Sequence, residues 1–302
     1  MVTGAASAAI GVVADRLLGE PPASLHPVAG FGRAMQAVEE RIYADERAAG
    51  VLHAAAGLAL GALAGRTVRS TAVATWSAVA GRSLGEAATR VGDALATGDL
   101  DRARELLPAL VGRDPSQLDA KEVARAVVES VAENTVDAVV APALWAAVAG
   151  APGAMAHRAV NTMDAMVGYR DERYQRYGWA SARMDDAAAW VPARATAALV
   201  AACRPRAAAL VWQTVRRDAA AHPSPNSGVA EAAFAAALGL RLGGESRYGD
   251  RIELRPALGT GRPPEAADIA SSVRLSHDVG LMLVAALAAA DLGARVLRRR
   301  RR

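Results

Sequence analysis

The sequence contains very little cysteine and lysine, and each scarcity excludes a class of site. Cys203 is the single cysteine, so an intrachain disulfide and a zinc site built from cysteines are excluded. It lies among alanine and valine, which predicts a packing role for the thiol. Lys121 is the single lysine and follows no glycine-rich loop, so an ordinary P-loop is absent. The hydrolase motif G-x-S-x-G and the zinc motif HExxH are also missing.

Charge and hydropathy narrow the class of protein further. The 35 basic and 31 acidic residues give a formal net charge of +4. This small excess, without helix-turn-helix or zinc-finger spacing, indicates no nucleic-acid partner. Hydrophobic residues make up 52% of the 302 residues, and the mean hydropathy is +0.13. These values favour a membrane protein, with an alanine-rich soluble helical bundle as the alternative.

Four apolar runs are candidates for membrane segments. They lie near residues 2–14, 51–65, 70–80 and 279–297, and a membrane-spanning helix needs about 20 apolar residues. By that measure all but the last are short. The runs 139–150 and 195–203 are shorter still and are predicted not to cross. The polar segments 112–137, 157–194 and 216–253 can then lie on one side of the membrane, and the five arginines 298–302 predict a cytoplasmic C-terminus.

Helical spacing dominates the pattern of the chain. Residues 83–110 form an amphipathic pattern that breaks at Gly98, with Asp99 as a cap for the second helix. Only residues 247–254 predict a short extended segment. We therefore predict an all-α fold, with residues 1–302 as a single multi-pass membrane domain in which interfacial or cytoplasmic helices and loops form the active site.

Three carboxylates are spaced for one face of a helix. Glu129, Glu133 and Asp137 follow each other at intervals of four residues, with Asn134 beside them. Like charges at this spacing repel each other, so a divalent cation, arginines or solvent must offset the repulsion. The apolar flanks favour a functional site over a solvated acidic stripe, and oxygen ligands of this kind suit Mg²⁺ together with substrate phosphates.

A second concentration of polar residues follows at 157–194. Asn161 and Asp164 share a helix face, and Tyr169, Arg170 and Arg173 come next. Arginines and acids are then mixed at Arg183, Asp185, Asp186 and Arg194. For any one of these residues a structural ion pair is the alternative, and their density in one segment favours a ligand site.

The loop 222–228 contains His222, Ser224, Asn226, two prolines and a glycine, and Glu231 follows it. Prolines and glycine predict a tight turn, which opens into a helix over 229–240. Backbone N–H groups at such a helix start can hold a phosphate, with Asn226 as the cap. A capped structural connector is the alternative.

Taken together, these segments resemble the CobD/CbiB family, the adenosylcobinamide-phosphate synthases of cobalamin biosynthesis. The resemblance spans nearly the whole chain, in family order. The matching residues are Asp15, His26-Pro27-Val28, Gly30, Gly112-Arg113-Asp114, residues 129–134 and 158–170, Glu172-Arg173-Tyr174, Gly178-Trp179, Ala182-Arg183, Asp185-Asp186, Pro192-Ala193-Arg194, residues 222–226, Glu231, Leu242-Gly243-Gly244 and Tyr248-Gly249. The chain departs from the family pattern at Ala138, where a glycine commonly follows the aspartate, and in its short, alanine-rich apolar segments.

The resemblance implies a multi-pass inner-membrane enzyme with a cytoplasmic active site. The implied reaction joins a carboxylate of adenosylcobyric acid to (R)-1-amino-2-propanol or its O-phosphate, and is expected to use ATP and Mg²⁺. The expected partners are the corrinoid, the amine and the lipid bilayer. A non-catalytic corrinoid-handling membrane protein, a transporter, or a structural subunit of a biosynthetic complex are the alternatives.

Individual roles follow from chemistry and are not assigned by the resemblance. Carboxylates supply oxygens for Mg²⁺, arginines grip phosphate or carboxylate, and His222 is a candidate base. The predicted catalytic residues are Glu129, Glu133, Asn134, Asp137, Asp164 and His222. The predicted substrate or phosphate ligands are His26, Asn161, Tyr169, Arg170, Arg173, Arg183, Arg194, Ser224, Asn226 and Glu231. The predicted Mg²⁺ ligands are Glu129, Glu133, Asp137, Asp185 and Asp186.

Overall fold

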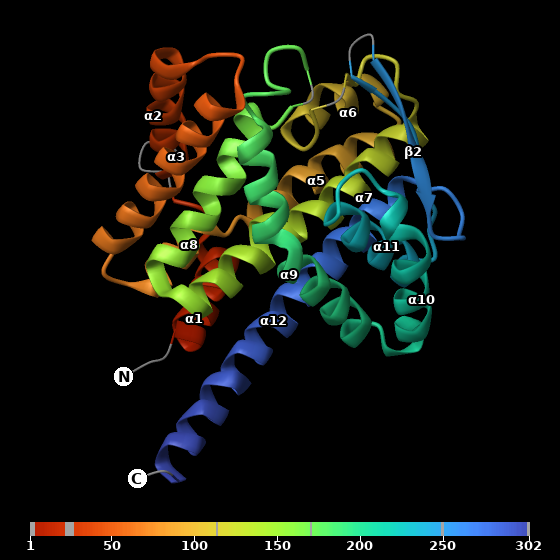
Figure 1. Ribbon diagram of the computed structural model, residues 1–302. Helices are drawn as coiled ribbons and strands as arrows, with labels where there is room; N and C mark the ends of the chain where they lie inside the picture. Colours follow the sequence, from red (N-terminus) through yellow and green to blue (C-terminus); the bar gives the residue numbers. More distant parts are fainter. Residues whose placement is uncertain (1–3, 22–26, 113, 170, 249–250, 301–302) are drawn as a thin grey trace. The chain divides into compact units, whose positions relative to one another are not determined.

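The chain is mainly helical in its computed structural model, which describes residues 4–21, 27–112, 114–169, 171–248 and 251–300 (Figure 1). The all-α prediction is confirmed, since the only sheet among these residues is one two-stranded hairpin. The elements are α1 (Gly4–Leu18), α2 (Pro27–Ile42), α3 (Arg47–Thr67), α4 (Thr71–Ala78), α5 (Gly81–Ala96), α6 (Leu100–Leu106), α7 (Ala120–Thr135), a π-helical turn (Val136–Val140), α8 (Ala141–Val167), α9 (Trp179–Cys203), α10 (Ala208–Asp218), α11 (Ser227–Leu238), β1 (Leu242–Tyr248), β2 (Arg251–Leu258) and α12 (Ala266–Arg300). Short 3₁₀ turns cover Leu107–Ala109, Pro205–Ala207 and Ala219–Ala221.

The chain divides into two compact units. Unit 1 comprises residues 1–80, 137–192 and 283–302, and unit 2 comprises residues 81–136 and 193–282. The division passes between α4 and α5, within the π-helical turn between Val136 and Asp137, and again within α9 and α12.

Unit 1 is built around α8, against which α1, α2, α3 and α4 pack. Small residues allow α3 to approach α8 closely. A Cβ atom added to Gly61 would lie 2.5 Å from the Cβ of Ala159, and one added to Gly65 would lie 2.5 Å from the Cα of Pro152. Glycines at intervals of four residues therefore form the face of α3 that contacts α8, as is common in packed membrane helices.

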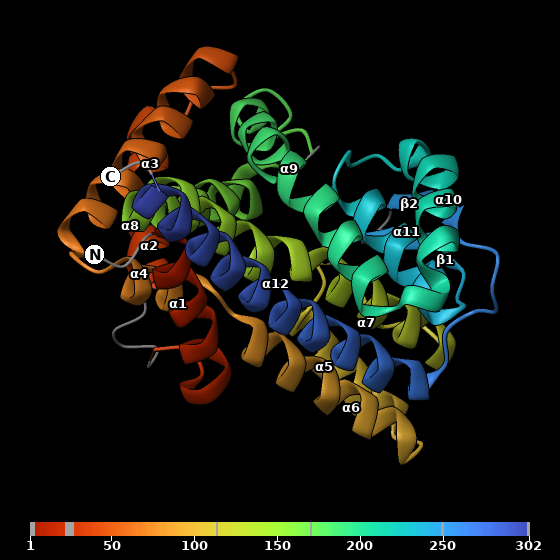
Figure 2. The ribbon, with the colours of Figure 1, turned by 90° about the horizontal axis from the view of Figure 1, so that it is seen from below.

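Unit 2 is built around α7, which packs against α5 and α11. Asp119 and Glu122 form a capping box that starts α7, with both of its hydrogen bonds at 2.8 Å. Helix α5 runs beside the first half of α12, where Gly92 faces Ile269 (Figure 2). The predicted break at Gly98 and cap at Asp99 are confirmed, because the Asp99 side chain accepts from the N–H of Arg102.

The predicted extended segment 247–254 is divided between two strands, with 247–248 at the end of β1 and 251–254 at the start of β2, and residues 249–250 lie outside the described residues. Strands β1 and β2 pair antiparallel, with an irregular register between Leu242 and Gly244. Gly243 has a φ of +85°, in the left-handed region that favours glycine. It forms the bulge that lets this end of the hairpin turn toward α7.

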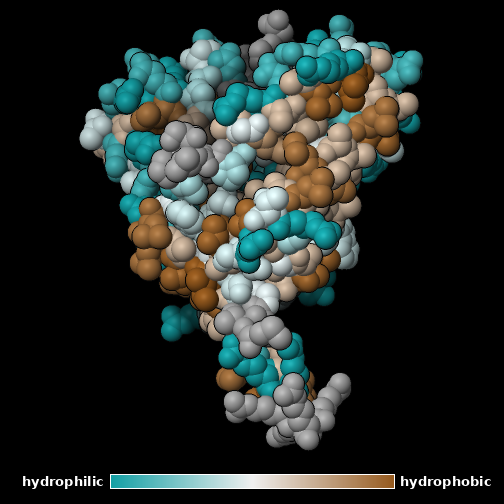
Figure 3. All heavy atoms as spheres, turned by 90° about the vertical axis from the view of Figure 1, so that its left-hand side faces the viewer, coloured by the Kyte–Doolittle hydropathy of each residue, from teal (hydrophilic) through white to brown (hydrophobic). Residues whose placement is uncertain are grey.

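Three stretches of helix are long and apolar enough to cross a membrane, counted over the described residues: Arg47–Thr67, Ala120–Val167 and Ala266–Arg298. The runs 51–65 and 279–297 lie within two of them, and α3 is longer than the apolar run had indicated. The runs 2–14 and 70–80 fall in α1 and α4, which have only 15 and 8 residues. Figure 3 shows hydrophobic residues gathered in large areas at the surface of one face.

The apolar run 139–150 lies within a longer helical stretch, Ala120–Val167. Whether this run crosses the membrane stays a prediction. Pro142 stands in the first turn of α8, where proline is tolerated, and the kink instead falls at Gly150, with φ 68° and ψ −153° just ahead of Pro152. Length and composition therefore allow this helix to span a membrane.

Candidate active site

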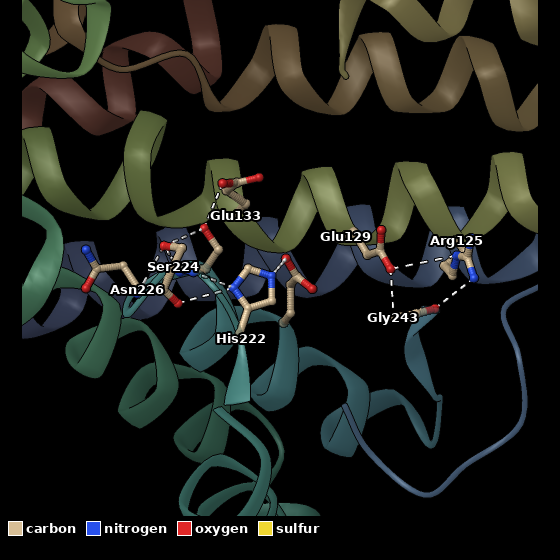
Figure 4. Close-up of polar contacts among 9 residues, drawn as sticks. Arg125, Glu129, Glu133, His222, Ser224, Asn226 and Gly243 are labelled. Atoms are coloured by element: carbon tan, nitrogen blue, oxygen red, sulfur yellow. Dashed lines mark hydrogen bonds and ion pairs between the residues drawn. The ribbon is translucent and has the colours of Figure 1, made fainter. Parts of the chain in front are cut away.

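Polar side chains from α7 meet the loop before α11 in unit 2 (Figure 4). The Ser227 hydroxyl donates to Glu133 Oε1 at 2.7 Å, and Ser224 Oγ lies 3.2 Å from Ser227 Oγ. Ser224 Oγ also accepts from the backbone N–H groups of Asn226 and Ser227 at 3.3 and 3.2 Å. The loop is thus closed on itself by Ser224 and fixed to α7 through Ser227.

His222 is buried and both of its ring nitrogens face groups of the protein. The backbone N–H of Ser224 lies 3.0 Å from Nδ1, and Nε2 lies 3.6 Å from an oxygen of the fully buried Glu231. The Ser224 carbonyl oxygen lies 3.2 Å from the same Nδ1, so Ser224 offers this nitrogen both a donor and an acceptor, and the tautomer decides which of the two it uses. Burial lowers the pKa of His222, with Arg255 acting in the same direction and Glu133 and Glu129 opposing it.

This geometry bears on the base role predicted for His222. The ring is buried, and both of its nitrogens face groups of the protein, Ser224 at Nδ1 and Glu231 at Nε2, rather than an open approach for an amine. The role of base stays a prediction, but the arrangement favours His222 as the residue that orders the loop. A Cβ atom on Gly228 would lie 2.5 Å from the Cβ of His222, so this glycine permits the close approach.

Asn226 and Arg194 form the next contact. Asn226 occupies the N-cap position of α11, but its side chain makes no capping hydrogen bond, which corrects the predicted capping role. Its Oδ1 instead accepts from Arg194 Nη1 at 3.1 Å. Ser224 Oγ accepts from the amides of Asn226 and Ser227, whereas the Val229 amide donates to the Asn226 carbonyl at 3.0 Å. Burial lowers the pKa of Arg194.

Glu129, one turn earlier on α7, is hydrogen-bonded to the hairpin. Its Oε1 accepts from the N–H of Gly243 at 2.9 Å, and the Gly243 carbonyl accepts from Arg125 Nη1 at 2.7 Å. Arg125 Nη2 also donates to the Glu245 carbonyl at 2.6 Å. Arg125 and Glu129 therefore hold the donor and the acceptor of one peptide segment (Figure 4).

Asn134 turns back onto its own helix, where its Nδ2 donates to the carbonyl of Ser130 at 3.0 Å. Glu133 differs from its neighbours. Its Oε1 is held by Ser227, whereas no described residue donates a hydrogen bond to its Oε2. Because Glu133 is only half-buried, Oε2 is the carboxylate oxygen of this cluster best placed for a ligand.

The remaining predicted acids lie in unit 1. Asp137 lies in the π-helical turn Val136–Val140, which follows α7 directly, and the shared face predicted for it with Glu129 and Glu133 stays a prediction. Its carbonyl accepts from His157 Nε2 at 3.3 Å. Asn161 Nδ2 donates to Asp185 Oδ1 at 3.5 Å, which connects α8 to α9. Arg183 lies 4.0 Å from Asp186 as a largely exposed pair.

Asp164 folds over the end of α8. The N–H of Gly168 donates to its carbonyl at 2.7 Å, and a Cβ atom on Gly168 would clash with the Asp164 carboxylate. Tyr169, just beyond, is 55% exposed and available to a ligand. His26 and Arg170 lie outside the described residues.

Arg173 is held by unit 1 itself. Its Nη2 donates to Glu39 Oε1 at 2.9 Å, and the same oxygen accepts from the Tyr174 hydroxyl at 3.0 Å. The guanidinium lies over the Tyr43 ring at 4.4 Å, and the Tyr43 hydroxyl donates to the Arg173 carbonyl at 3.0 Å. The hydrogen bonds to Glu39 and Tyr174 raise the pKa of Arg173. These contacts favour a structural role over the predicted phosphate role.

Among the described residues no group of three or more histidines, cysteines or acids is placed to hold a metal ion. Mg²⁺ commonly needs only one or two protein carboxylates, since water and substrate phosphates complete its shell. Glu133 Oε2 fits that requirement. Glu129, already bonded to Gly243 and Arg125, fits it less well.

Sequence reasoning missed Arg125, Ser227 and Glu39. Arg125 had a local signal, because it precedes Glu129 by four residues and such pairs meet on a helix. Ser227 and Glu39 had none, since they act on residues 94 and 134 positions away.

The fold and the site thus define a helical protein that has three candidate membrane spans and a polar cluster between α7 and α11. The model of the CobD/CbiB protein family matches residues 8–276, so the chain belongs to this family. It is 49% identical over 293 residues to the cobalamin biosynthesis protein CobD of Mycobacterium tuberculosis, covering 92% of each chain. It is 44% identical over 299 residues to the CobD of Chromobacterium violaceum, covering 93% of this chain and 94% of the relative.

The CobD of Geobacter metallireducens is 42% identical over 293 residues, covering 90% of this chain and 92% of the relative. No solved structure matches the chain.

Proposed function

We propose that this protein acts in cobalamin biosynthesis as a carbon–nitrogen ligase. It would join a carboxylate of adenosylcobyric acid to (R)-1-amino-2-propanol or its O-phosphate, at the expense of ATP. Family membership and the names of the relatives support the pathway. The observation that carries the enzymatic assignment is the Glu133–Ser227 contact, which fixes the loop 222–228 beside an acidic helix.

The chemistry sets the requirements of the site. A carboxylate is a poor electrophile, so its oxygen first attacks the γ-phosphorus of ATP, and the bond to the β-phosphate oxygen breaks to release ADP. The amine nitrogen then attacks the acyl phosphate carbon, the bond to phosphate breaks, and the amine proton passes to solvent. Both steps concentrate negative charge on phosphate oxygens, which cations must stabilise.

The residues of unit 2 can meet these requirements. Glu133 would hold Mg²⁺ through Oε2, and the bound ion would neutralise phosphate charge. Arg194, oriented by Asn226, would grip a phosphate with its planar guanidinium. His222 and Glu231 would keep the loop in the shape that presents Asn226 and Ser227. In this proposal Glu129 and Arg125 position α7 relative to the hairpin.

The cellular setting is also part of the proposal. ATP is a cytoplasmic substrate, and the arginines 298–302 favour a cytoplasmic C-terminus by the positive-inside rule. We therefore place the enzyme in the inner membrane with the polar cluster of unit 2 on the cytoplasmic side.

The test is an assay of the full chain in detergent or nanodiscs. Adenosylcobyric acid, Mg·ATP and either amine are supplied, and ADP and the corrinoid product are measured by mass spectrometry. The proposal expects product and ADP in equal amounts, with ADP release dependent on both organic substrates. Corrinoid binding without ADP or product would instead favour the non-catalytic corrinoid-handling alternative.

A further inference from the structure

Unit 1 contains a pocket between α2, α3 and α8 that the proposed reaction does not use. Its volume is about 250 Å³. The walls are almost entirely apolar, with Val28 and Phe31 from α2, Leu60 from α3, and Met155 from α8. Arg158 and Thr162 of α8 complete the lining.

Among the described residues, Arg158 is the one charged residue that lines this pocket. Its Nε is buried and has no hydrogen-bond partner in the described part of the chain. Nη1 lies 3.4 Å from Asn161 Oδ1, which is a long hydrogen bond. Thr162 uses its hydroxyl proton on the Arg158 carbonyl at 2.7 Å and adds no charge. The carboxylates of Glu20 and Asp137 act on the Arg158 charge, but the buried Nε–H stays without an acceptor, so an anion in the pocket would meet an unused donor.

The surroundings of the pocket indicate where that anion comes from. The pocket is formed by α3 and α8, both of which lie in stretches able to cross a membrane. On α3, Leu60 is 40% exposed, and nearby Leu52 and Leu63 are 63% and 60% exposed. A helix face of this kind is stable against lipid rather than water. Molecules that reach the pocket from this side are therefore lipids.

Size and polarity argue against the substrates as occupants. Pockets for drug-sized ligands have volumes of roughly 300–1,000 Å³, so about 250 Å³ cannot enclose a corrinoid. Aminopropanol phosphate is small enough, but none of the described lining residues is acidic and able to accept its ammonium group.

We propose that this pocket binds one anionic phospholipid, with the lipid phosphate on Arg158 and the start of an acyl chain against Phe31, Leu60 and Met155. The lipid fills the space between α2 and the α3–α8 pair. This site is independent of the ligase reaction, so a failure of either proposal leaves the other intact.

The experiment measures lipid binding to the purified full chain in detergent. Phosphatidylglycerol and phosphatidylcholine with identical acyl chains are titrated, and binding is followed by native mass spectrometry and by the melting temperature. Wild type should bind phosphatidylglycerol at least about tenfold more tightly, a difference of about 1.4 kcal/mol. Arg158→Gln should bring the two affinities together, and Arg158→Lys should keep part of the preference.

Two further variants separate charge from shape. Arg33→Gln removes an exposed arginine of α2 that does not line the pocket, and should leave the preference unchanged. Ala34→Phe puts a ring into the pocket and should weaken both lipids equally. Equal wild-type affinity for the two lipids, or a preference that survives Arg158→Gln, would overturn the proposal. Displacement of bound lipid by aminopropanol phosphate would assign the pocket to substrate and overturn it as well.

Discussion

The carboxylate of Glu133 and the hydroxyl of Ser227 form a 2.7 Å hydrogen bond although they lie 94 residues apart in the chain. This contact fixes one oxygen of Glu133 and leaves the other toward the half-exposed side of the helix. The same residue can therefore anchor a loop and bind a cation, and the two roles can be separated by mutation.

Glu133→Gln keeps an oxygen that accepts from Ser227 but removes the negative charge. If Glu133 binds Mg²⁺, we expect kcat to fall at least about 100-fold, since metal stabilisation of transition-state charge is worth several kcal/mol. Ser227→Ala is the matched control, because it removes the hydrogen bond and keeps the carboxylate. Its kcat should fall only about tenfold, which corresponds to the lower end of the roughly 1.5–3 kcal/mol of a hydrogen bond to a charged group. Wild-type turnover of Glu133→Gln at limiting Mg²⁺ would refute the metal role.

His222 predicts how stability changes with pH. Its folded-state pKa lies below the ordinary value of 6.5 because the ring is buried. Below pH 6.5 the unfolded chain thus binds a proton that the folded chain does not, and stability falls as the pH drops toward the folded-state pKa. The slope is at most about 1.4 kcal/mol per pH unit for one group.

The measurement compares melting temperatures of wild type and His222→Gln between pH 5 and 8. The variant should be less stable at pH 8, where it lacks the bond to the Ser224 N–H. It should also lose less stability on acidification. Parallel curves for the two proteins would show that His222 does not titrate in this range.

A substitution of Gly243 tests how much the hydrogen bonds between the hairpin and α7, made by Gly243 with Arg125 and Glu129, contribute to stability. A Cβ atom there would clash with the carbonyl of Pro256, and the residue has φ +85°. Gly98 is a suitable control, with φ +79° and no atom within 4 Å of an added Cβ. Gly98→Ala should destabilise by about 1–2 kcal/mol from backbone strain alone.

Gly243→Ala should destabilise the protein by more than Gly98→Ala, because the clash also displaces the peptide held by Arg125 and Glu129. Denaturant or thermal unfolding of both variants provides the comparison. Equal losses of stability in the two variants would mean that the Gly243 peptide can shift without weakening its hydrogen bonds to Arg125 and Glu129.

The sequence predicted what depends on local pattern. Helical spacing around residues 83–110 and the Asp99 cap follow from neighbouring residues, and the structure contains them. Extended backbone was also predicted at 247–254, but the described residues of this segment belong to two paired strands rather than one. The helical stretch around 139–150 is longer than the apolar run, because Pro142 stands in the first turn of α8, directly after the π-helical turn Val136–Val140, and the kink falls at Gly150. Likewise, the shared helix face of Glu129 and Glu133 was predictable from their spacing, but the π-helical turn that contains Asp137 was not.

The site was predictable only as a set of residues and not as a set of contacts. Long-range pairs have no periodic signal, so the link between Glu133 and Ser227 could not be foreseen. Arg173 illustrates the consequence. As an arginine among acids and tyrosines it resembled a phosphate ligand, and only the fold places it on Glu39.

The Glu39–Arg173 contact gives the last prediction. Glu39 is buried on α2 and accepts from both Arg173 and the Tyr174 hydroxyl, so Glu39→Ala leaves both donors without their acceptor. We expect residues 168–178 to open locally as a result. Trypsin cleavage after Arg173, followed by mass spectrometry, should then become at least about tenfold faster, which corresponds to about 1.4 kcal/mol in the opening equilibrium.

Asp45→Asn is the matched control for the contact of Glu39 with Arg173 and Tyr174. Asp45 lies 3.7 Å from Arg176, but both side chains are more than half exposed, and such pairs contribute little stability. This variant should be cleaved at the wild-type rate. Glu39→Gln should fall between wild type and Glu39→Ala, because its amide oxygen still accepts a hydrogen bond. If Glu39→Ala is as resistant as wild type, the Tyr43 and Tyr174 rings hold Arg173 without the carboxylate, and the guanidinium is then available for the phosphate role that its sequence context first indicated.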